Sequence, residues 1–496
     1  MMTAGPGMAV EAPRAGQSAR RFATAALMTA TAMQAGDATI VNVALPHLAR
    51  DLGGGMALGA WVVTSYLCAT AVVAPLTGWL NRRYGAQLVF GSAISLFVIA
   101  SLCCALAPSA AAMIAFRIIQ GASGGVLHPM AQAILLDIHP KERHGQVLGM
   151  WGAAAMAGPI MGPALGGIIT DLASWRWAFA INLPLGILIL CGTWRVLPGR
   201  ETRRDLPIDG VGIILLIAAI GALQLFLERS VDHSWLGSPE LAIELSIAVL
   251  AVLLIGVRAR RAAFTLFRLD LFRDANFAIA AFYNFVTSAL LFVAVLFLPA
   301  LGEGPLGFSA TLAGGTIVPR AILMMLTMLV AGRLIGKINY RILLASGWIL
   351  MAAGLTLLSA LTVQNALLLI VLGSAVQSLG AGLLLTPLST LAFSTLAPDR
   401  RTDAAGLYSL LRQLGCACGV ALMTAVLAAK EGAYLADLVV QFAAVGGLIP
   451  APRIDAANLR AYAECFRLMA VASLILAPGI LLFRLEAAAS AVKEAA

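Results

Sequence analysis

The sequence contains few charged residues. Charged side chains make up 11% of its 496 residues, hydrophobic ones make up 60%, and the mean hydropathy is +0.92. A soluble protein carries about 25% charged residues, because its surface faces water. The composition therefore excludes a soluble enzyme, a nucleic-acid-binding protein and a disordered chain. It leaves a polytopic membrane protein whose surroundings are the lipid bilayer.

Several chemical signatures are also missing. There is no phosphate-binding loop of the GxxxxGKS/T type, which argues against ATP as the energy source. The seven cysteines lack the spacing of a disulfide framework or a metal site. One Asp and one His, Asp37 and His128, lie deep in apolar segments, which is too few for an intramembrane enzyme. No repeated pore ring favours a channel. We expect no catalytic residues, no metal and no cofactor.

The chain does contain long hydrophobic runs. A spanning helix needs about 20 apolar residues, and the sequence predicts an all-α integral membrane protein with fourteen spans. They are residues 22–46, 57–80, 88–107, 110–136, 146–170, 177–197, 208–227, 241–257, 277–301, 311–335, 342–361, 366–390, 403–428 and 466–484.

The longest predicted outer loop is residues 429–465, between the last two spans. Its apolar residues have helical spacing: Tyr434, Leu435, Leu438, Val439 and Phe442. We expect part of the segment to form an amphipathic helix, within a hairpin at the membrane surface.

The placement of Lys and Arg explains the net charge of +9. If the N-terminus is cytoplasmic, most of the 33 basic residues fall in the tails and in loops on that side. Cytoplasmic loops carry this excess in membrane proteins. The sequence therefore predicts a multi-pass protein of the cell membrane with both termini in the cytoplasm, and no nucleic-acid partner.

An internal repeat divides the chain. Gly124 recurs as Gly382 with an offset of 258 residues, and Gly78 recurs as Gly332 with an offset of 254. Both pairs are eight spans apart, so the repeated halves have parallel topology, which is typical of transporters. The predicted organisation is an N-terminal tail (1–21), a six-helix bundle (22–200), two extra spanning helices (201–262), a second six-helix bundle (263–484) and a C-terminal tail (485–496).

Asp37 and Arg117 are expected at the same depth in the membrane. Asp37 lies nine residues before Pro46 and Arg117 eight residues after Ser109, which places them roughly 13 and 12 Å from the outer side. A carboxylate at this depth is a functional-site hypothesis by default. Burial and a nearby cation both change how tightly it holds a proton, so the pair is a candidate for proton coupling. A static ion pair is the alternative.

The fifth predicted span repeats small residues on one helix face. Glycines let two helix backbones approach closely, so we expect this face to pack against another helix. The residues are Gly158, Gly162 and Gly166, flanked by Pro159, Pro163 and Gly167.

Several segments, in matching order, resemble the fourteen-helix drug:proton antiporters of the major facilitator superfamily, the EmrB/QacA type. The match is close in spans 1–6 and 9–13 and weak in the other spans. The segments that carry it are Asp37–Pro46, Trp61–Tyr66, Pro75–Leu80, Arg117–Gly121, Gly158–Gly167, Trp175–Pro184 and Gly406–Gly415.

The resemblance implies the major facilitator fold, with two six-helix bundles plus two extra central helices. It implies a proton-coupled antiporter that exports amphipathic small molecules by alternating access, as in multidrug efflux. Asp37 and Arg117 would couple the proton, and the face with Gly162 would act as a pivot. A dedicated exporter or flippase of a lipid or secondary metabolite shares the fold and is the alternative. Whether a periplasmic adaptor protein is a partner stays open.

The loop after the second span departs from the family pattern. Gly78, Arg83 and Gly85 of the conformational motif are present. Arg82 stands where the family has Asp, and Ala86 stands where the motif ends in Arg. In the family that Asp helps to latch one conformation, so the sequence puts this latch in question.

Polar residues inside the spans are candidates for a substrate cavity, although simple packing explains each equally well. They are Asn42, Tyr66, Gln120, Asn284, Gln377, Tyr408 and Arg412. Arg320 and Arg412 add cations at membrane depth. If both face the cavity, we expect neutral, monovalent or weakly acidic cargo rather than polycations.

Overall fold

The computed structural model describes residues 17–53, 55–193, 206–229, 239–261, 268–443 and 450–483, and this part of the chain is helical. The N-terminal half contains α1 (Gln17–Asp51), α2 (Gly55–Val73), α3 (Thr77–Tyr84), α4 (Ala86–Ala105), α5 (Ala110–Ile138), α6 (His144–Leu172), α7 (Arg176–Ala180) and α8 (Asn182–Thr193). Two helices follow, α9 (Gly210–Arg229) and α10 (Pro239–Arg261). The C-terminal half contains α11 (Ala275–Glu303), α12 (Ala310–Gly315), α13 (Ile317–Leu334), α14 (Tyr340–Ser359), α15 (Ala366–Ser394), α16 (Arg401–Ala443) and α17 (Ala451–Leu476).

Thirteen helical segments of the described residues are long and apolar enough to cross a membrane. They correspond in order to the second to fourteenth predicted spans. The first predicted span is α1, a 35-residue helix that is less apolar because it carries Gln34, Asp37 and Asn42. It packs along α6 and α8 inside the N-terminal half, so it belongs to the same bundle.

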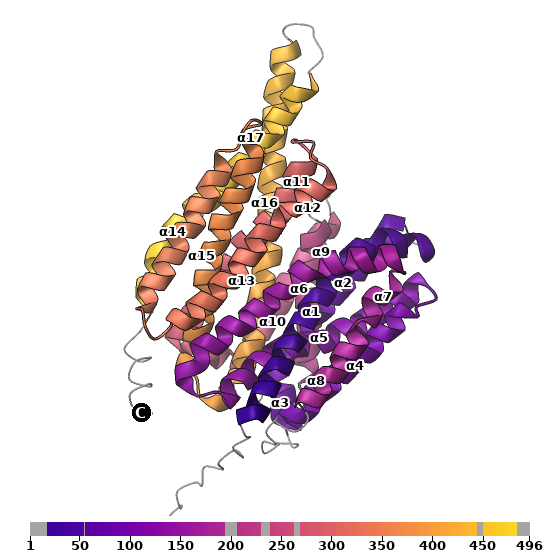
Figure 1. The fold of residues 1–496 in the computed structure, drawn as a ribbon, viewed down its shortest axis with the longest axis vertical. Coiled ribbons are helices and arrows are strands. Elements are labelled where there is room, and N and C mark those ends of the chain that lie inside the picture. The colour runs from indigo at the N-terminus through magenta and orange to yellow at the C-terminus, as the bar shows by residue number, and fades with distance from the viewer. Residues whose placement is uncertain are drawn as a thin grey trace, which may run out of the picture.

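The two halves meet at one end and separate toward the other. Figure 1 shows α6 and α13 together at their lower ends and apart above. At the lower end Gly145 of α6 lies against Ile335, and Gly149 lies against the backbone of Met328 and Gly332. The end at which the halves meet is the one that carries the basic loops predicted to be cytoplasmic. The halves are thus in contact at this end, which we call the closed end.

The two extra helices, α9 and α10, lie outside the two bundles. They pack on each other, and α9 contacts both α2 and α16. Asp209, just before α9, accepts hydrogen bonds from Arg258 of α10 at 2.6 and 2.9 Å. α9 thus touches both halves, while α10 turns a largely apolar, exposed surface outward.

The prediction of a long outer loop at residues 429–465 was wrong, whereas the predicted helical spacing and hairpin are confirmed. α16 runs without interruption to Ala443, and α17 already begins at Ala451. A helix of 43 residues is roughly 65 Å long, about twice the hydrocarbon thickness of a bilayer. The two helices therefore continue beyond the other helix ends as a projecting hairpin (Figure 1). Lys430 and Glu464 pair across it at 2.7 Å, so its polar residues stabilise a helical pair instead of a surface loop.

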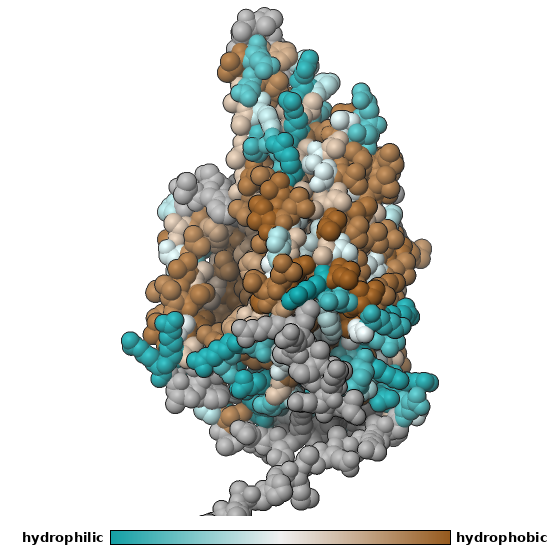
Figure 2. Space-filling model, turned by 90° about the vertical axis from the view of Figure 1, so that its left-hand side faces the viewer, coloured by the Kyte–Doolittle hydropathy of each residue, from teal (hydrophilic) through white to brown (hydrophobic). Residues whose placement is uncertain are grey.

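The surface is divided into bands of hydropathy. Figure 2 shows brown, apolar side chains over the middle of the molecule and teal, polar ones at its lower end and on the projecting hairpin. Exposed apolar residues such as Leu253, Ile349 and Leu368 belong to spanning helices. A wide apolar belt between two polar ends is the surface expected of a protein embedded in a bilayer.

Candidate functional site

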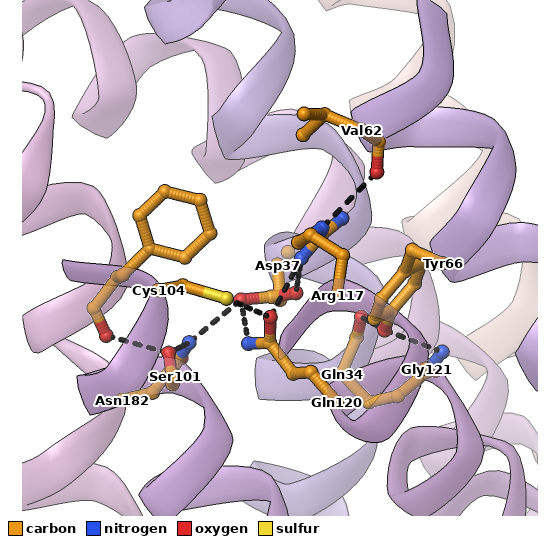
Figure 3. Close-up of polar contacts among 12 residues, drawn as sticks. Gln34, Asp37, Val62, Tyr66, Ser101, Cys104, Arg117, Gln120, Gly121 and Asn182 are labelled. Atoms are coloured by element: carbon orange, nitrogen blue, oxygen red, sulfur yellow. Dashed lines mark hydrogen bonds and ion pairs between the residues drawn. The ribbon is translucent and has the colours of Figure 1, made fainter. Parts of the chain in front are cut away.

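The carboxylate of Asp37 lies at the centre of a buried hydrogen-bond cluster in the N-terminal half (Figure 3). Arg117 Nη1 of α5 donates to Asp37 Oδ2 at 2.8 Å. Gln120 Nε2 and Asn182 Nδ2 donate to Oδ1 at 2.8 and 2.7 Å. The side chains of Asp37 and Arg117 are 0% and 1% exposed. The pairing predicted from their equal depth is confirmed, and their coupling role stays a prediction.

The guanidinium of Arg117 is held on several sides. Its Nε donates to the Val62 carbonyl at 3.2 Å, and its Nη1 also donates to Gln120 Oε1 at 2.8 Å. Its central carbon lies 4.1 Å from the ring centroid of Tyr66, a cation–π distance. α2 and α5 therefore fix a cation beside the α1 carboxylate, which makes a buried charge pair tolerable in the membrane interior.

Sequence reasoning missed Asn182 as a member of this cluster. Its amide bridges Asp37 and the Ser101 hydroxyl, at 2.7 and 2.9 Å. Ser101 in turn donates to the Phe179 carbonyl at 2.8 Å. Asn182 lies in the segment Trp175–Pro184 that carried part of the family resemblance, so the signal was present. Its span is distant in the sequence from Asp37, and only the fold brings the two together.

The glycine face of α6 packs directly on α1. A Cβ at Gly158 would meet the backbone of Gly36 and Ala32, and one at Gly166 would meet the Ile40 carbonyl. A Cβ at Gly162 would meet the Thr39 hydroxyl. This close approach of α6 to α1 at Gly158, Gly162 and Gly166, the glycine seam, lies next to Asp37 along α1. The seam and the carboxylate therefore belong to one site. Pro159 is exposed, Gly167 is half-buried, and the side chain of Pro163 lies outside the described residues.

A cavity of about 240 Å³ adjoins this seam among the described residues, between α1, α6 and α8. Asp37, Asn182, Gly158 and Gly162 line it together with apolar side chains such as Met161. Its volume is below the roughly 300–1,000 Å³ of a typical drug-sized site. In this conformation it gives the Asp37 region room to rearrange rather than space for a whole cargo molecule.

The segment after the second span, which carries the conformational motif Gly78, Arg83 and Gly85, contacts the C-terminal half. Arg82, near the end of α3, forms an ion pair with Asp403 in the first turn of α16. Asn81 Nδ2 also donates to the Thr402 hydroxyl at 2.9 Å.

Gly78 lies against Asp403 with no space for a Cβ. Gly85 has a φ of 82°, which favours glycine. The Arg83 guanidinium donates to the Leu206 carbonyl, close to the start of α9.

The other predicted cavity residues do not join the Asp37 cluster as a group. Tyr66 and Gln120 belong to it, as described. In the C-terminal half Asn284 Nδ2 donates to the Tyr408 carbonyl at 3.1 Å, and Gln377 Nε2 to the Leu290 carbonyl at 3.2 Å. Arg412 is half-buried, and the side chain of Asn42 lies outside the described residues. Asn284, Gln377 and Tyr408 are buried within their own bundle.

Comparison with known proteins agrees with this architecture. The Major Facilitator Superfamily matches residues 27–420 and 321–494. The chain is 33% identical to the multidrug export protein EmrB of Haemophilus influenzae, over 84% of this chain and 82% of that protein. It is 34% identical to EmrB of Escherichia coli strain K12, over 84% and 81%. It is 32% identical to the fatty acid resistance protein FarB of Neisseria gonorrhoeae, over 84% and 82%.

Solved structures share the fold at low sequence identity. The crystal structure of the human organic anion transporter MFSD10 superposes with a TM-score of 0.62 at 16% identity, covering 92% of this chain and 99% of that chain. The proton:xylose symporter XylE superposes with a TM-score of 0.57 at 14% identity, covering 92% and 95%. At these identities the likeness concerns the fold alone.

Proposed function

The chain belongs to the major facilitator superfamily, among its multidrug export proteins, and from this premise we propose that it is a proton-coupled antiporter. It exports amphipathic small molecules across the cell membrane by alternating access. The observation that carries the proposal is the buried Asp37 carboxylate, paired with Arg117 at 2.8 Å and set against the glycine seam between α1 and α6.

Protonation of Asp37 changes what its neighbours can do. The carboxylate accepts three donors, from Arg117, Gln120 and Asn182. A bound proton removes the negative charge and turns one oxygen into a donor, so the ion pair with Arg117 is lost. The donors that face the protonated oxygen then need new partners, because buried polar groups without a partner are costly. Proton binding thus drives rearrangement around α1.

The rearrangement reaches the rest of the bundle through the seam. Gly158, Gly162 and Gly166 keep the backbone of α6 against α1, so a small shift of α1 displaces α6. α6 also packs on α13 at the closed end. A change at Asp37 can therefore act on the contact between the halves, and bistable packing of this kind converts small shifts into domain motion.

The closed end has ionic contacts that must break for the halves to exchange sides. Arg82 pairs with Asp403, and Arg401 of α16 pairs with Asp137 of α5 at 3.2 Å. We propose that this end faces the cytoplasm, with both termini, because the basic loops are there. Cargo is then released on the outer side in the arrangement described here. An adaptor protein that prolongs the path would meet the outer side, where the α16–α17 hairpin projects (Figure 1).

A dedicated exporter of a lipid-like molecule is the second candidate function. One relative of 32% identity is named for resistance to fatty acids, and the spanning helices expose apolar side chains to the bilayer. This candidate shares the fold and the coupling machinery with the first. It predicts one substrate class instead of many.

The experiment that tests the proposed function uses purified protein in proteoliposomes. An imposed pH gradient is combined with a chemically diverse panel of amphipathic compounds, and counterflow of each is measured. Accelerated transport of several unrelated compounds supports a multidrug antiporter, and transport of lipid-like compounds alone supports the second candidate. Transport that ignores the pH gradient for every compound rejects proton coupling.

A further inference from the structure

Arg320 of α13 is a buried cation without a counter-ion among the described residues. The residue is 3% exposed. Its Nε donates one hydrogen bond, to the Ser378 hydroxyl of α15 at 3.3 Å. Its Nη1 and Nη2 are both buried and have no hydrogen-bond partner. Two guanidinium nitrogens that carry most of the donor capacity of the side chain are therefore unused.

This state differs from that of Arg117, another buried arginine of the spans. Arg117 has the Asp37 carboxylate, the Gln120 oxygen and the Val62 carbonyl as acceptors. An unpaired charge at membrane depth is strongly unfavourable, and such residues mark substrate or ion sites by default. Arg320 is thus the described side chain that most needs an external anion.

The internal repeat relates Arg320 to a residue of the Asp37 cluster in the N-terminal half. Arg320 follows Tyr66 by 254 residues, the offset that also separates Gly78 from Gly332. Ser378 follows Gln120 by 258 residues, the offset that separates Gly124 from Gly382. Arg320 and Ser378 therefore occupy, in the C-terminal half, the positions of two members of the Asp37 cluster. The cluster in the N-terminal half is neutral overall, and its counterpart carries one positive charge.

We propose that Arg320 is the anion-binding residue of a substrate subsite in the C-terminal half, which takes the singly charged carboxylate head of an amphipathic cargo. The inference rests on the proposed export function and adds the substrate class. A guanidinium with two free nitrogens forms a bidentate pair with a carboxylate. Ser378 keeps the Nε side of the group in place. In the arrangement described here Arg320 is 3% exposed, so the anion reaches it through a local movement of α13 against α15.

The test compares three amphiphiles with one twelve-carbon chain and different head charge: laurate, 1-dodecanol and dodecyltrimethylammonium. Binding of radiolabelled laurate is measured on the full chain in nanodiscs, with the other two as competitors and empty nanodiscs as background. Wild-type protein is expected to prefer laurate to 1-dodecanol by about 10- to 100-fold, the range for a hydrogen-bonded charge pair.

Variants of Arg320 separate charge recognition from packing. Arg320→Gln is expected to lose the preference for laurate, and Arg320→Lys to keep part of it, because the charge remains without the planar fork. Arg333→Gln is the matched control, since it removes an exposed cation from the same helix. Its preference should equal that of the wild type. If Arg320→Gln does not fold, the wild type and Arg320→Lys still decide the question.

Two results would overturn the inference: a wild-type protein without preference for the carboxylate, or an unchanged preference in Arg320→Gln. Either leaves proton-driven export of other compounds intact, so the proposed function would stand. Conversely, Arg320-dependent laurate binding without any response of transport to a pH gradient supports the anion subsite and rejects the proposed function.

Discussion

Arg82 of α3 and Asp403 of α16 form an ion pair that joins the two halves at their closed end. The related antiporters are expected to have the acidic partner in the loop where Arg82 stands. Here the carboxylate lies on the opposite half, in the first turn of α16, where a negative charge also interacts favourably with the helix N-terminus. The basic and acidic residues have exchanged places between the halves, but an ion pair between the halves is retained. The presence of Arg82 where the family has Asp therefore does not imply the loss of a latch.

Reversing the charges of this pair tests the latch. Arg82→Asp and Asp403→Arg each place like charges against one another, and we expect transport at least about tenfold slower for either. The double variant restores an ion pair of opposite polarity and should recover most of the rate. The measurement is the initial rate of pH-driven transport in proteoliposomes.

The matched control for the latch is the exposed pair of Arg176 and Asp51, which lies within the N-terminal half. The two side chains are 42% and 48% exposed, and exposed pairs contribute little. Reversal of this pair should leave the rate nearly unchanged. A double variant of Arg82 and Asp403 that stays as slow as the single variants would refute the charge-pair account.

The glycine seam predicts an asymmetric response to alanine. At Gly158 a methyl group would meet the backbone of α1, which cannot move locally, so Gly158→Ala should destabilise the protein by about 1–3 kcal/mol and slow transport. At Gly221 of α9 nothing lies within 4 Å of the added carbon. Gly221→Ala should be neutral or stabilising by up to about 1 kcal/mol. Thermal unfolding of the purified variants measures both, and equal responses would exclude close packing as the reason for Gly158.

Asn182 should contribute to pH-driven transport through its hydrogen bond to Asp37. Asn182→Ala removes one of the three donors to the Asp37 carboxylate. A hydrogen bond to a charged group contributes about 1.5–3 kcal/mol, so we expect the initial rate of pH-driven transport to fall by roughly 10- to 100-fold. Ser95→Ala is the control, because the Ser95 hydroxyl bonds only to its own helix. A transport rate equal to that of the wild type would show that Asn182 has no influence on the coupling carboxylate.

The sequence predicted those parts of the site that depend on depth and helical periodicity. Equal distances from the span ends placed Asp37 beside Arg117, and four-residue spacing placed Gly158, Gly162 and Gly166 on one face. Contacts between distant spans left no local signal. The partner of Arg82 and the bridge made by Asn182 therefore required the fold.

The last two spans show a different limit of prediction from sequence, which concerns where helices end. Hydropathy marks where a helix can enter a membrane, but it does not mark where the helix stops. The polar residues of 429–465 ended the predicted spans, although Lys, Glu and Ala are good helix formers. In the structure α16 and α17 continue as a hairpin, across which Lys430 and Glu464 form an ion pair.

The most direct test of proton coupling is pH-driven transport by Asp37→Asn in proteoliposomes, alongside binding of the same cargo. Asparagine keeps the size of the side chain and cannot carry the proton. The account predicts that Asp37→Asn binds cargo but shows no acceleration by a pH gradient, whereas Asp51→Asn, at the exposed end of the same helix, behaves like the wild type. Undiminished pH-driven transport by Asp37→Asn would contradict the account.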